Sequence, residues 1–317
     1  MRIGIEFVPD SPIEKIVKLT KLAEEAGFDN VWITDHYNNR NVWATLTALA
    51  MSTEKIMMGP GVTNPFHISP ALTASAAVTI NELSNGRAVI GMGAGDKVTL
   101  NSLGIKWDKP VSAVVEAIQY MQALTAGNKF KHDGKVFKVK SAKLAIVKKE
   151  EVLDSKGKPI MKGDKPLKVA PKIPIYAGAQ GPMMLRETAK VADGILINAS
   201  HPKDFDLAME NIREGVKEAG RDIGDIDVTA YASFSIGKTR EEALEGDAKI
   251  VVAFIVAGSP DVVLERHNLD MDACSKVRGL LAEGNFKDLP SAVTDEMIDA
   301  FAVVGNKDQC IKRIEDL

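Results

Sequence analysis

The stretch Ile3-Gly4-Ile5-Glu6-Phe7-Val8 opens the chain with a strand that is apolar except for one carboxylate. Strand side chains alternate between faces, so Glu6 shares its face with Gly4 and Val8. A run this apolar is typical of a parallel strand covered on both faces, which predicts that Glu6 points into the interior. Two interpretations stay open: an ion pair with a buried Lys or Arg, or a proton donor kept neutral by burial.

Strand and helix patterns alternate along the rest of the chain. Ser11-Pro12-Ile13-Glu14 has the cap, proline and acidic residue of a helix start, and Gly27 can end that helix. Further strands are predicted at 30–34, 55–59, 87–92, 173–177, 194–198 and 227–236, with helices at 42–51, 70–83, 111–126, 183–191 and 203–219. This alternation predicts a parallel α/β protein. Its spacing favours a (β/α)8 TIM-like barrel over a doubly wound sheet, because no GxGxxG fingerprint follows the first strand.

Two insertions interrupt the single barrel domain that we predict over residues 1–317. Residues 128–172 combine lysines with alternating apolar positions, which predicts an exposed, hairpin-rich insertion, and residues 256–300 predict a helical one. Seven strands are predicted in all, and a final helix begins near Asn306. An eighth strand and its helix would need residues beyond Leu317, so we expect the last βα unit of the barrel to be absent from this chain. A longer native chain, a piece supplied by a partner and a miscounted strand would each explain this, and we favour the first.

Composition limits the classes of function. The chain has 317 residues, 45% of them hydrophobic, and a net charge of −3, which argues against a general nucleic-acid or membrane-surface binder. Its two cysteines, Cys274 and Cys310, have no CxxC or Cys/His spacing, which argues against structural zinc and for a reducing compartment. No apolar run reaches membrane-spanning length, so we expect a soluble cytoplasmic protein.

Polar and glycine-rich turns follow the predicted strands, and in a barrel they converge on one face. They are Glu6, Asp35-His36-Tyr37, Gly61-Val62-Thr63-Asn64-Pro65, Gly93-Ala94-Gly95-Asp96, Gly178-Ala179-Gln180-Gly181-Pro182 and Asn198-Ala199-Ser200-His201. Glycine lets backbone N–H groups approach a flat or anionic ligand, and a turn before a helix can bind phosphate. Structural interpretations also stay open: helix caps for Asp35, Asp96 and His201, packing for His36, and a tight turn for Gly93 and Gly95.

The face of the barrel formed by these turns suits the binding of a planar cofactor better than a hydrolase or metal site. A serine hydrolase is disfavoured because no GxSxG motif occurs. No metal site is predicted, because no two His, Asp or Glu residues recur at ligand spacing on one predicted helix.

Seven segments carry a family resemblance that runs from residue 1 to the end of the chain. They are Ile3-Gly4-Ile5-Glu6-Phe7-Val8-Pro9, Trp32-Ile33-Thr34-Asp35-His36-Tyr37-Asn38-Asn39-Arg40, Gly59-Pro60-Gly61-Val62-Thr63-Asn64, Gly95-Asp96-Lys97, Ile175-Tyr176-Ala177-Gly178-Ala179-Gln180-Gly181-Pro182, and the ranges 196–204 and 249–260. Together they resemble the coenzyme F420-dependent methylenetetrahydromethanopterin reductases, a family of the bacterial-luciferase-like barrels. The family normally continues past the position of Leu317 and has a shorter segment at 128–172.

The resemblance implies a homo-oligomeric enzyme, dimer or tetramer, of archaeal methane metabolism. Its reaction is a reversible hydride transfer between reduced coenzyme F420, an 8-hydroxy-5-deazaflavin, and 5,10-methylenetetrahydromethanopterin, which gives 5-methyltetrahydromethanopterin. By resemblance, Glu6 is the catalytic acid, Asp96 is a second candidate near the pterin, and Gly61–Val62 is a cis peptide bond. The implied cofactor site consists of Asp35, His36, Gly61, Val62, Thr63, Asn64, Gly93, Gly95, Ala177, Gly178, Gln180, Gly181 and Pro182.

The chemistry of the residues fits this reaction independently. Opening one C–N bond of the methylene bridge gives an iminium that accepts hydride, and a general acid that protonates the departing nitrogen assists the opening. Glu6, with a pKa raised by burial, is suited to this role. Two alternatives stay open: another luciferase-like oxidoreductase that uses FMN or oxidises an alcohol with the deazaflavin, and a non-catalytic flavin-binding or structural barrel.

Overall fold

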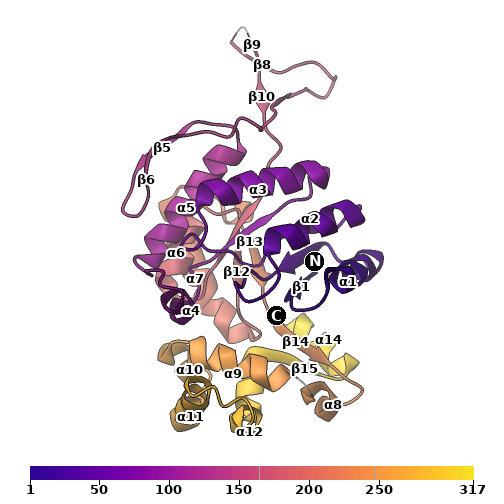
Figure 1. The fold of residues 1–317 in the computed structure, drawn as a ribbon, viewed down its shortest axis with the longest axis vertical. Coiled ribbons are helices and arrows are strands. Elements are labelled where there is room, and N and C mark those ends of the chain that lie inside the picture. Colours follow the sequence, from indigo (N-terminus) through magenta and orange to yellow (C-terminus); the bar gives the residue numbers. More distant parts are fainter. Residues whose placement is uncertain (164, 246) are drawn as a thin grey trace. The chain divides into compact units, whose positions relative to one another are not determined.

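The computed structural model describes residues 1–163, 165–245 and 247–317 and divides into two compact units (Figure 1). Unit 1 comprises Met1–Ile195 and Gly215–Asp227, and unit 2 comprises Leu196–Glu214 and Val228–Leu317. Each unit therefore combines two separate stretches of the chain. Among the described residues, no helix is both long and apolar enough to cross a membrane.

Unit 1 begins with three strand–helix repeats. They are β1 (Gly4–Phe7), α1 (Ile13–Glu25), β2 (Asn30–Ile33), α2 (Val42–Ser52), β3 (Met57–Pro60) and α3 (Pro70–Leu83). The three strands are parallel in the order β1-β2-β3, with Glu6 beside Trp32 and Trp32 beside Gly59. The predicted pattern of alternation is thus confirmed here. Ser69 caps α3 ahead of Pro70 at the first helical position, which is the arrangement that proline favours.

A second parallel series follows. Its elements are β4 (Ile90–Met92), α4 (Lys97–Ser102), α5 (Pro110–Thr125), β11 (Ile175–Gly178), α6 (Pro182–Ala189), β12 (Gly194–Ile197), α7 (Pro202–Glu218), the 3-10 helix η1 (Ile223–Asp225) and β13 (Asp227–Ala230). The strand order is β13-β12-β11-β4, and Gly91 of β4 lies beside Tyr176 of β11. Isolated parallel bridges, Met58 with Ala88 and Thr63 with Met92, connect the third strand to the fourth. The boundary between the two units falls within this series.

Two charged residues, Arg87 and Glu24, fix the chain where it enters β3. The Arg87 guanidinium, in a residue only 9% exposed, donates hydrogen bonds to backbone carbonyls and a hydroxyl of the segment 50–56. The Glu24 carboxylate accepts hydrogen bonds from three successive backbone N–H groups of residues 54–56. A loop with few backbone partners of its own is thereby satisfied by side chains.

A β-rich insertion, residues 128–172, separates α5 from β11. It contains β5 (Phe130–Asp133), β6 (Lys138–Ala142), β7 (Glu150–Glu151), β8 (Met161–Lys162), β9 (Lys165–Pro166) and β10 (Lys168–Val169). Glu116 of α5 holds the β5–β6 hairpin, because its carboxylate accepts backbone hydrogen bonds of 2.7, 3.1 and 2.9 Å from residues 135–137. Figure 1 shows β8, β9 and β10 projecting beyond α3 and α5 of the same unit.

Unit 2 is mainly helical and has its own core. Its elements after β13 are β14 (Ser233–Ile236), α8 (Arg240–Leu244), α9 (Ala248–Gly258), α10 (Asp261–Arg266), α11 (Met271–Ala282), α12 (Leu289–Ala292), α13 (Asp295–Phe301), β15 (Ala302–Gly305) and α14 (Lys307–Asp316). Buried Val252, Val256, Val277, Ile298 and Phe301 belong to one apolar cluster that joins the helices to β15.

The end of the chain contains one short strand that the sequence did not predict. The predicted strand 227–236 is divided into β13 and β14, and β14 pairs in parallel with β15, which leads directly into α14. These two strands form a two-stranded sheet of their own and, among the described residues, are paired neither with β1 nor with β13. The expectation that the last βα unit of the barrel is absent therefore stays a prediction. β15 escaped detection because it has four residues and follows α13 with no intervening turn residue.

Candidate active site

Glu6 lies on β1 with its side chain exposed rather than buried. Ile5 and Phe7, on the opposite face, are half-buried, whereas Gly4 and Val8, on the face of Glu6, are exposed. The expectation that both faces of this strand are covered is therefore wrong, since only one face packs against the rest of unit 1. The structure does not supply the burial on which the proton-donor argument for Glu6 depended.

Asp35 is held by a histidine that sequence analysis did not single out. Directly after β2, its carboxylate Oδ2 lies 3.0 Å from Nε2 of His67, and Nδ1 of the same ring lies 2.5 Å from the side-chain nitrogen of Asn64. The Asn64 side-chain oxygen accepts backbone hydrogen bonds from Phe66 and His67. The turns after β2 and β3 are thus joined by side chains that both come from the predicted cofactor site.

The side chain of Val62 lies in a hollow formed by glycines. Gly61–Val62 is a cis peptide bond, as the family resemblance implied. A Cβ placed on Gly91, Gly93 or Gly178 would come within 2.8, 2.5 or 3.4 Å of a Val62 methyl group. Glycine is therefore required by packing at 91 and 93, where β4 approaches the bulge after β3, whereas a Cβ at Gly178 of β11 would make an ordinary van der Waals contact.

Two threonine hydroxyls beside this bulge are buried without a hydrogen-bond partner. Within residues 1–163, 165–245 and 247–317, Oγ1 of Thr34 and Oγ1 of Thr63 are among the few buried polar atoms that lack one. Thr63 is 0% exposed and Thr34 is 6% exposed. An unmade hydrogen bond at a buried hydroxyl costs about 1–3 kcal/mol, so a pair of them marks a site that a ligand can complete.

Asp96 begins helix α4. Its Oδ2 accepts a 2.7 Å hydrogen bond from the backbone N–H of Thr99, which is the capping interpretation left open above. Gly95, with φ of 69°, lies close to Asn64, because a Cβ at this glycine would come within 3.0 Å of the amide carbon. Asp96 is exposed, so the carboxylate stays accessible while it caps the helix.

The turn 177–182 leads from β11 into α6. Ala177 is buried in the sheet beside Met92, Gly181 precedes the helix as its cap residue, and Pro182 is the first helical residue. Gln180 is exposed at the turn, and His36 is likewise exposed beside Asp35. The packing interpretation left open for His36 does not hold, because a packing histidine would be buried.

An aromatic and polar chain crosses the interior of unit 1 from β2 to β13. Trp32 contacts Tyr176 edge-to-face with ring centroids 5.6 Å apart. The Tyr176 hydroxyl donates a 2.6 Å hydrogen bond to Asp227, whose carboxylate pairs with Arg2 at 2.6 Å. Burial raises the pKa of the Tyr176 phenol well above its usual range, and the bond to Asp227 acts in the same direction. The Tyr176 hydroxyl therefore stays protonated and acts as a hydrogen-bond donor to Asp227.

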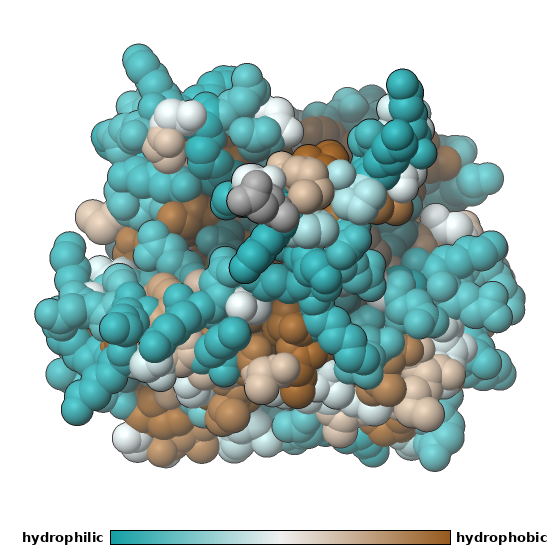
Figure 2. Space-filling view, turned by 90° about the horizontal axis from the view of Figure 1, so that it is seen from above, coloured by the Kyte–Doolittle hydropathy of each residue, from teal (hydrophilic) through white to brown (hydrophobic). Residues whose placement is uncertain are grey.

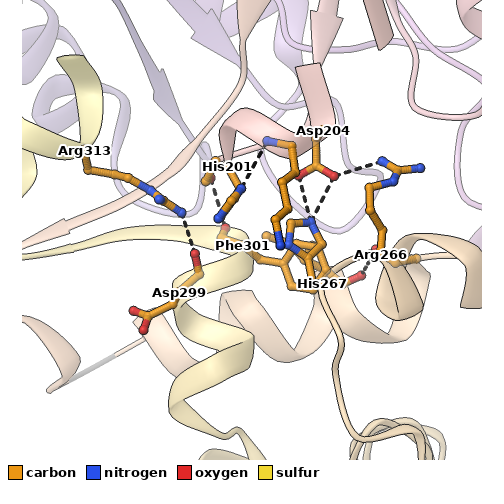
Figure 3. Close-up of polar contacts among 11 residues, drawn as sticks. His201, Asp204, Arg266, His267, Asp299, Phe301 and Arg313 are labelled. Atoms are coloured by element: carbon orange, nitrogen blue, oxygen red, sulfur yellow. Dashed lines mark hydrogen bonds and ion pairs between the residues drawn. The ribbon is translucent and has the colours of Figure 1, made fainter. Parts of the chain in front are cut away.

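Unit 2 contains a second polar cluster, which Figure 3 shows around Asp204. The Asp204 carboxylate lies 3.0 Å from Nε2 of His267 and 3.0 Å from the Arg266 guanidinium. His201 stacks edge-on against His267, with ring centroids 5.1 Å apart. Burial lowers the pKa of His201, and Arg313 and His267 act in the same direction.

His201 has the capping role that its position before Pro202 predicted. Its Nδ1 accepts a 3.2 Å hydrogen bond from the backbone N–H of Lys203 in the first turn of α7. A cavity of about 500 Å³ in unit 2 borders His201, Lys203, His267 and Arg313. Sequence reasoning missed Asp204 and His267, because residues that far apart in the chain show no common spacing.

Part of the predicted site falls into two connected groups within unit 1. In one group His67 joins Asp35 to Asn64, and Gly95 lies beside Asn64. The other group gathers Gly61–Thr63, Gly93 and Gly178 around Val62. These contacts place Glu6, His36, Asp96 and Gln180 in neither group. Among the described residues, no group of three or more His, Cys, Asp or Glu is arranged to hold a metal ion.

Comparison with known proteins places the chain in a family. A model described as luciferase-like monooxygenase matches residues 1–317. A 5,10-methylenetetrahydromethanopterin reductase of Archaeoglobus fulgidus is 51% identical over 100% of this chain and 90% of the relative. The 5,10-methylenetetrahydromethanopterin reductase of Methanolobus tindarius is 48% identical over 100% of this chain and 90% of the relative.

Solved structures agree with these relatives. The coenzyme F420-dependent tetrahydromethanopterin reductase of Methanopyrus kandleri has a TM-score of 0.85 and 40% identity, covering 100% of this chain and 89% of that one. An F420-dependent secondary alcohol dehydrogenase shares the fold with a TM-score of 0.74 at 20% identity, covering 100% and 90%. The predicted fold class, an α/β barrel of the luciferase-like type, is confirmed. The chain belongs to the luciferase-like family and, within it, to the methylenetetrahydromethanopterin reductases.

Proposed function

We propose that this protein catalyses the reversible transfer of hydride between reduced coenzyme F420 and 5,10-methylenetetrahydromethanopterin, which gives the 5-methyl product. The observation that carries the proposal is full-length similarity, at 41–51% identity, to three reductases named for this substrate. The FMN-dependent and non-catalytic alternatives have no observation of comparable reach in their favour.

The residues around the third-strand bulge fit a planar deazaflavin. Glycines at 91, 93 and 178 add no side chain beside Val62, so the bulge packs closely against β4 and β11 and, in this proposal, supports one face of the ring. The hydroxyls of Thr34 and Thr63 have no partner among the described residues and can complete hydrogen bonds to a polar ring edge. In this proposal Asp35, His36, Asn64, Gly61–Thr63, Gly93, Gly95 and the turn 177–182 hold the cofactor.

The cofactor, when bound, supplies a hydride donor and acceptor, and the chain supplies positioning and a proton. Glu6 is proposed as the acid that protonates the departing nitrogen of the pterin, and Asp96 is the second candidate. Glu6 is accessible from solvent on β1, which allows a substrate to reach it. General acid catalysis of this kind contributes about 10²–10⁴-fold.

The test is an anaerobic assay with reduced coenzyme F420 and methylenetetrahydromethanopterin, followed by the absorbance of the oxidised deazaflavin. We expect oxidation that depends on both protein and pterin. Parallel reactions with a secondary alcohol and with FMN address the other luciferase-like chemistries. Turnover with one of these, and none with the pterin, would overturn the proposal. Cofactor binding without any turnover would favour the non-catalytic interpretation.

Assembly and location belong to the same proposal. The pterin is the expected small-molecule partner, a homo-oligomer is the expected assembly, and the cytoplasm is the expected compartment. Size measurement of the purified protein and fractionation of cells test the last two separately from activity.

A further inference from the structure

The interior of unit 1 contains two large aromatic rings, Trp32 of β2 and Tyr176 of β11, which contact each other edge-to-face. Both residues are almost completely buried, at 5% and 6% exposure. Figure 2 shows, by contrast, an outer face on which hydrophobic side chains form separate patches among hydrophilic ones. The roles proposed above for Glu6 and for the cofactor-binding turns do not involve this aromatic pair.

Trp32 lies against both components of the proposed reaction site. The strand register places it beside Glu6, and residues that are neighbours on paired strands share one face of the sheet. A Cβ at Gly4, on that face of β1, would come within 3.3 Å of the indole nitrogen. A Cβ at Gly91 would lie 3.4 Å from Cζ3 of Trp32 and 2.8 Å from a Val62 methyl group. The indole therefore extends from the strand of the acid to the glycine that packs on the bulge.

Tyr176 restrains the indole, and its own position is fixed at both ends of the ring. Its hydroxyl donates a 2.6 Å hydrogen bond to Asp227. A Cβ at Gly194 would come within 2.3 Å of Cε1 of the tyrosine, so glycine at this position leaves the space that the ring occupies. Because edge-to-face aromatic contacts have a preferred geometry, a tyrosine that cannot shift also holds the ring of Trp32.

The contacts form a circuit that begins and ends at the first strand. The Asp227 carboxylate lies 2.6 Å from the guanidinium of Arg2, which precedes β1. The side chains of this ion pair are 57% and 37% exposed, so the pair itself contributes little in water. The hydroxyl of Tyr176 is in a buried residue and would be destabilised without its acceptor. We therefore expect the hydrogen bond, more than the ion pair, to hold the aromatic rings.

We propose that Trp32 and Tyr176 are positioning residues, which hold Glu6 and the Val62 bulge at a fixed separation across the reaction site. This inference rests on the proposed function, because it assigns both residues to the geometry of that reaction. Hydride transfer needs the reacting atoms about 3–3.5 Å apart, and a misplacement of about 1 Å can cost about 10²-fold in rate. A rigid indole between the strand of the acid and the bulge prevents that misplacement.

The first experiment compares steady-state kinetics of the full chain with those of Tyr176→Phe, which keeps the ring and removes only the hydroxyl. We expect kcat to fall by about tenfold. The KM for the pterin and the Kd for coenzyme F420 should stay within about twofold, because the binding surfaces remain. Tyr120→Phe is the matched control, since Tyr120 is likewise buried but stacks on Phe130 of the insertion. It should leave kcat, KM and Kd unchanged.

Substitutions at the polar end of the circuit separate the hydrogen bond from the ion pair. Asp227→Asn keeps an acceptor oxygen for the tyrosine hydroxyl, so it should retain most of the wild-type kcat. Asp227→Ala removes the acceptor and should resemble Tyr176→Phe. Arg2→Gln removes only the exposed ion pair and should change kcat by less than about twofold.

Hydrogen exchange of the protein without any ligand provides a readout besides activity. The backbone N–H of Gly61 donates to Ile33 at 2.8 Å, and that of Thr63 donates to Gly91 at 3.0 Å. In Tyr176→Phe and Asp227→Ala we expect faster exchange at these two amides and in β1 than in wild type, because the indole is less restrained. Tyr120→Phe should exchange at the wild-type rate in both segments.

Two results would overturn the proposal. One is a Tyr176→Phe protein with wild-type kcat and wild-type exchange in β1 and the bulge. The other is a Tyr176→Phe protein that loses stability or cofactor affinity while kcat is unchanged, which would make the hydroxyl merely structural. A wild-type protein without turnover would instead refute the proposed function, and the exchange rates would then decide by themselves whether the aromatic pair holds β1 and the bulge.

Discussion

Nε2 of His67 lies 3.0 Å from Oδ2 of Asp35, and the contact of Nδ1 with Asn64 determines which of the two ring nitrogens carries the proton. The Asn64 oxygen accepts two backbone N–H groups, so the atom that faces Nδ1 of His67 is the NH2 group. Nδ1 is then the acceptor, and Nε2–H donates to Asp35. The histidine therefore orients the carboxylate within the proposed cofactor site.

We predict that His67→Ala weakens coenzyme F420 binding by about tenfold or more, because Asp35 loses the donor that orients it. His67→Gln, whose amide can also donate, should restore part of the affinity. Fluorescence titration of the cofactor measures both dissociation constants. An unchanged affinity in His67→Ala would remove His67 from any positioning role.

Glu6→Gln is predicted to bind the cofactor normally and to lose turnover by about 10²–10⁴-fold, since the amide cannot donate the proton. Stopped-flow or steady-state rates under anaerobic conditions measure the loss. Glu14→Gln, at an exposed position of α1, is the control. Near wild-type turnover in Glu6→Gln would transfer the acid role to Asp96, and the turnover of Asp96→Asn would then be decisive.

The hollow around Val62 gives a packing prediction. Gly93→Ala places a Cβ 2.5 Å from a Val62 methyl group, so we expect a loss of about 1–3 kcal/mol in the free energy of unfolding. Val62→Ala in the same background removes the clashing methyl group and should recover most of that loss. Gly181→Ala is the matched control, because its Cβ would meet nothing within 4 Å. Urea denaturation of wild type, Gly93→Ala, Val62→Ala, the double variant and Gly181→Ala measures the effects, and additive losses in the double variant would contradict the clash.

The clamp at Glu116 gives a pH dependence. Burial alone would raise the pKa of the Glu116 carboxyl, but the backbone donors at 135–137 and His132 outweigh it and lower the pKa. A carboxyl with a lowered folded pKa stabilises the protein above its unfolded pKa, near 4.5, and loses that contribution as the pH falls through the folded pKa. Glu116→Gln should therefore cost about 1–3 kcal/mol at neutral pH, and less as the pH falls below 4.5.

Unfolding free energies of wild type and Glu116→Gln at a series of pH values check this behaviour. Glu210→Gln, exposed on α7, should show no comparable loss. A gap between wild type and Glu116→Gln that stays constant down to acid pH would show that the carboxylate charge is irrelevant to the clamp.

Local patterns in the sequence sufficed for much of the fold. Apolar runs of strand length and helix starts such as Ser69-Pro70 depend on neighbouring residues, so they can be read in one pass along the chain. β15 was missed because Ala302–Gly305 follows a helix directly and is too short to show a period. Its identity depends on pairing with β14, which is a tertiary contact.

The candidate site was predictable in composition but not in detail. Turns rich in glycine, aspartate and asparagine pointed to the correct segments, whereas the contact of His67 with Asp35 spans 32 positions and leaves no local pattern. The exposure of Glu6 was mispredicted because a strand's hydrophobicity does not report which of its faces is covered. Side chains that bond to distant loops, such as Glu24 and Arg87, are also missed, because their partners lie about thirty positions away in the chain and leave no local pattern.

The discontinuity of the two units has a consequence for biosynthesis. Unit 1 needs residues 215–227, which leave the ribosome only after the first stretch of unit 2, and unit 2 needs the final helix. Unit 1 can be completed once residue 227 has emerged, whereas the segment 196–214 of unit 2 must wait for residues 228–317. We expect that no cut near residue 195 or 228 yields two independently expressible halves, because each cut separates one unit from a stretch that it needs.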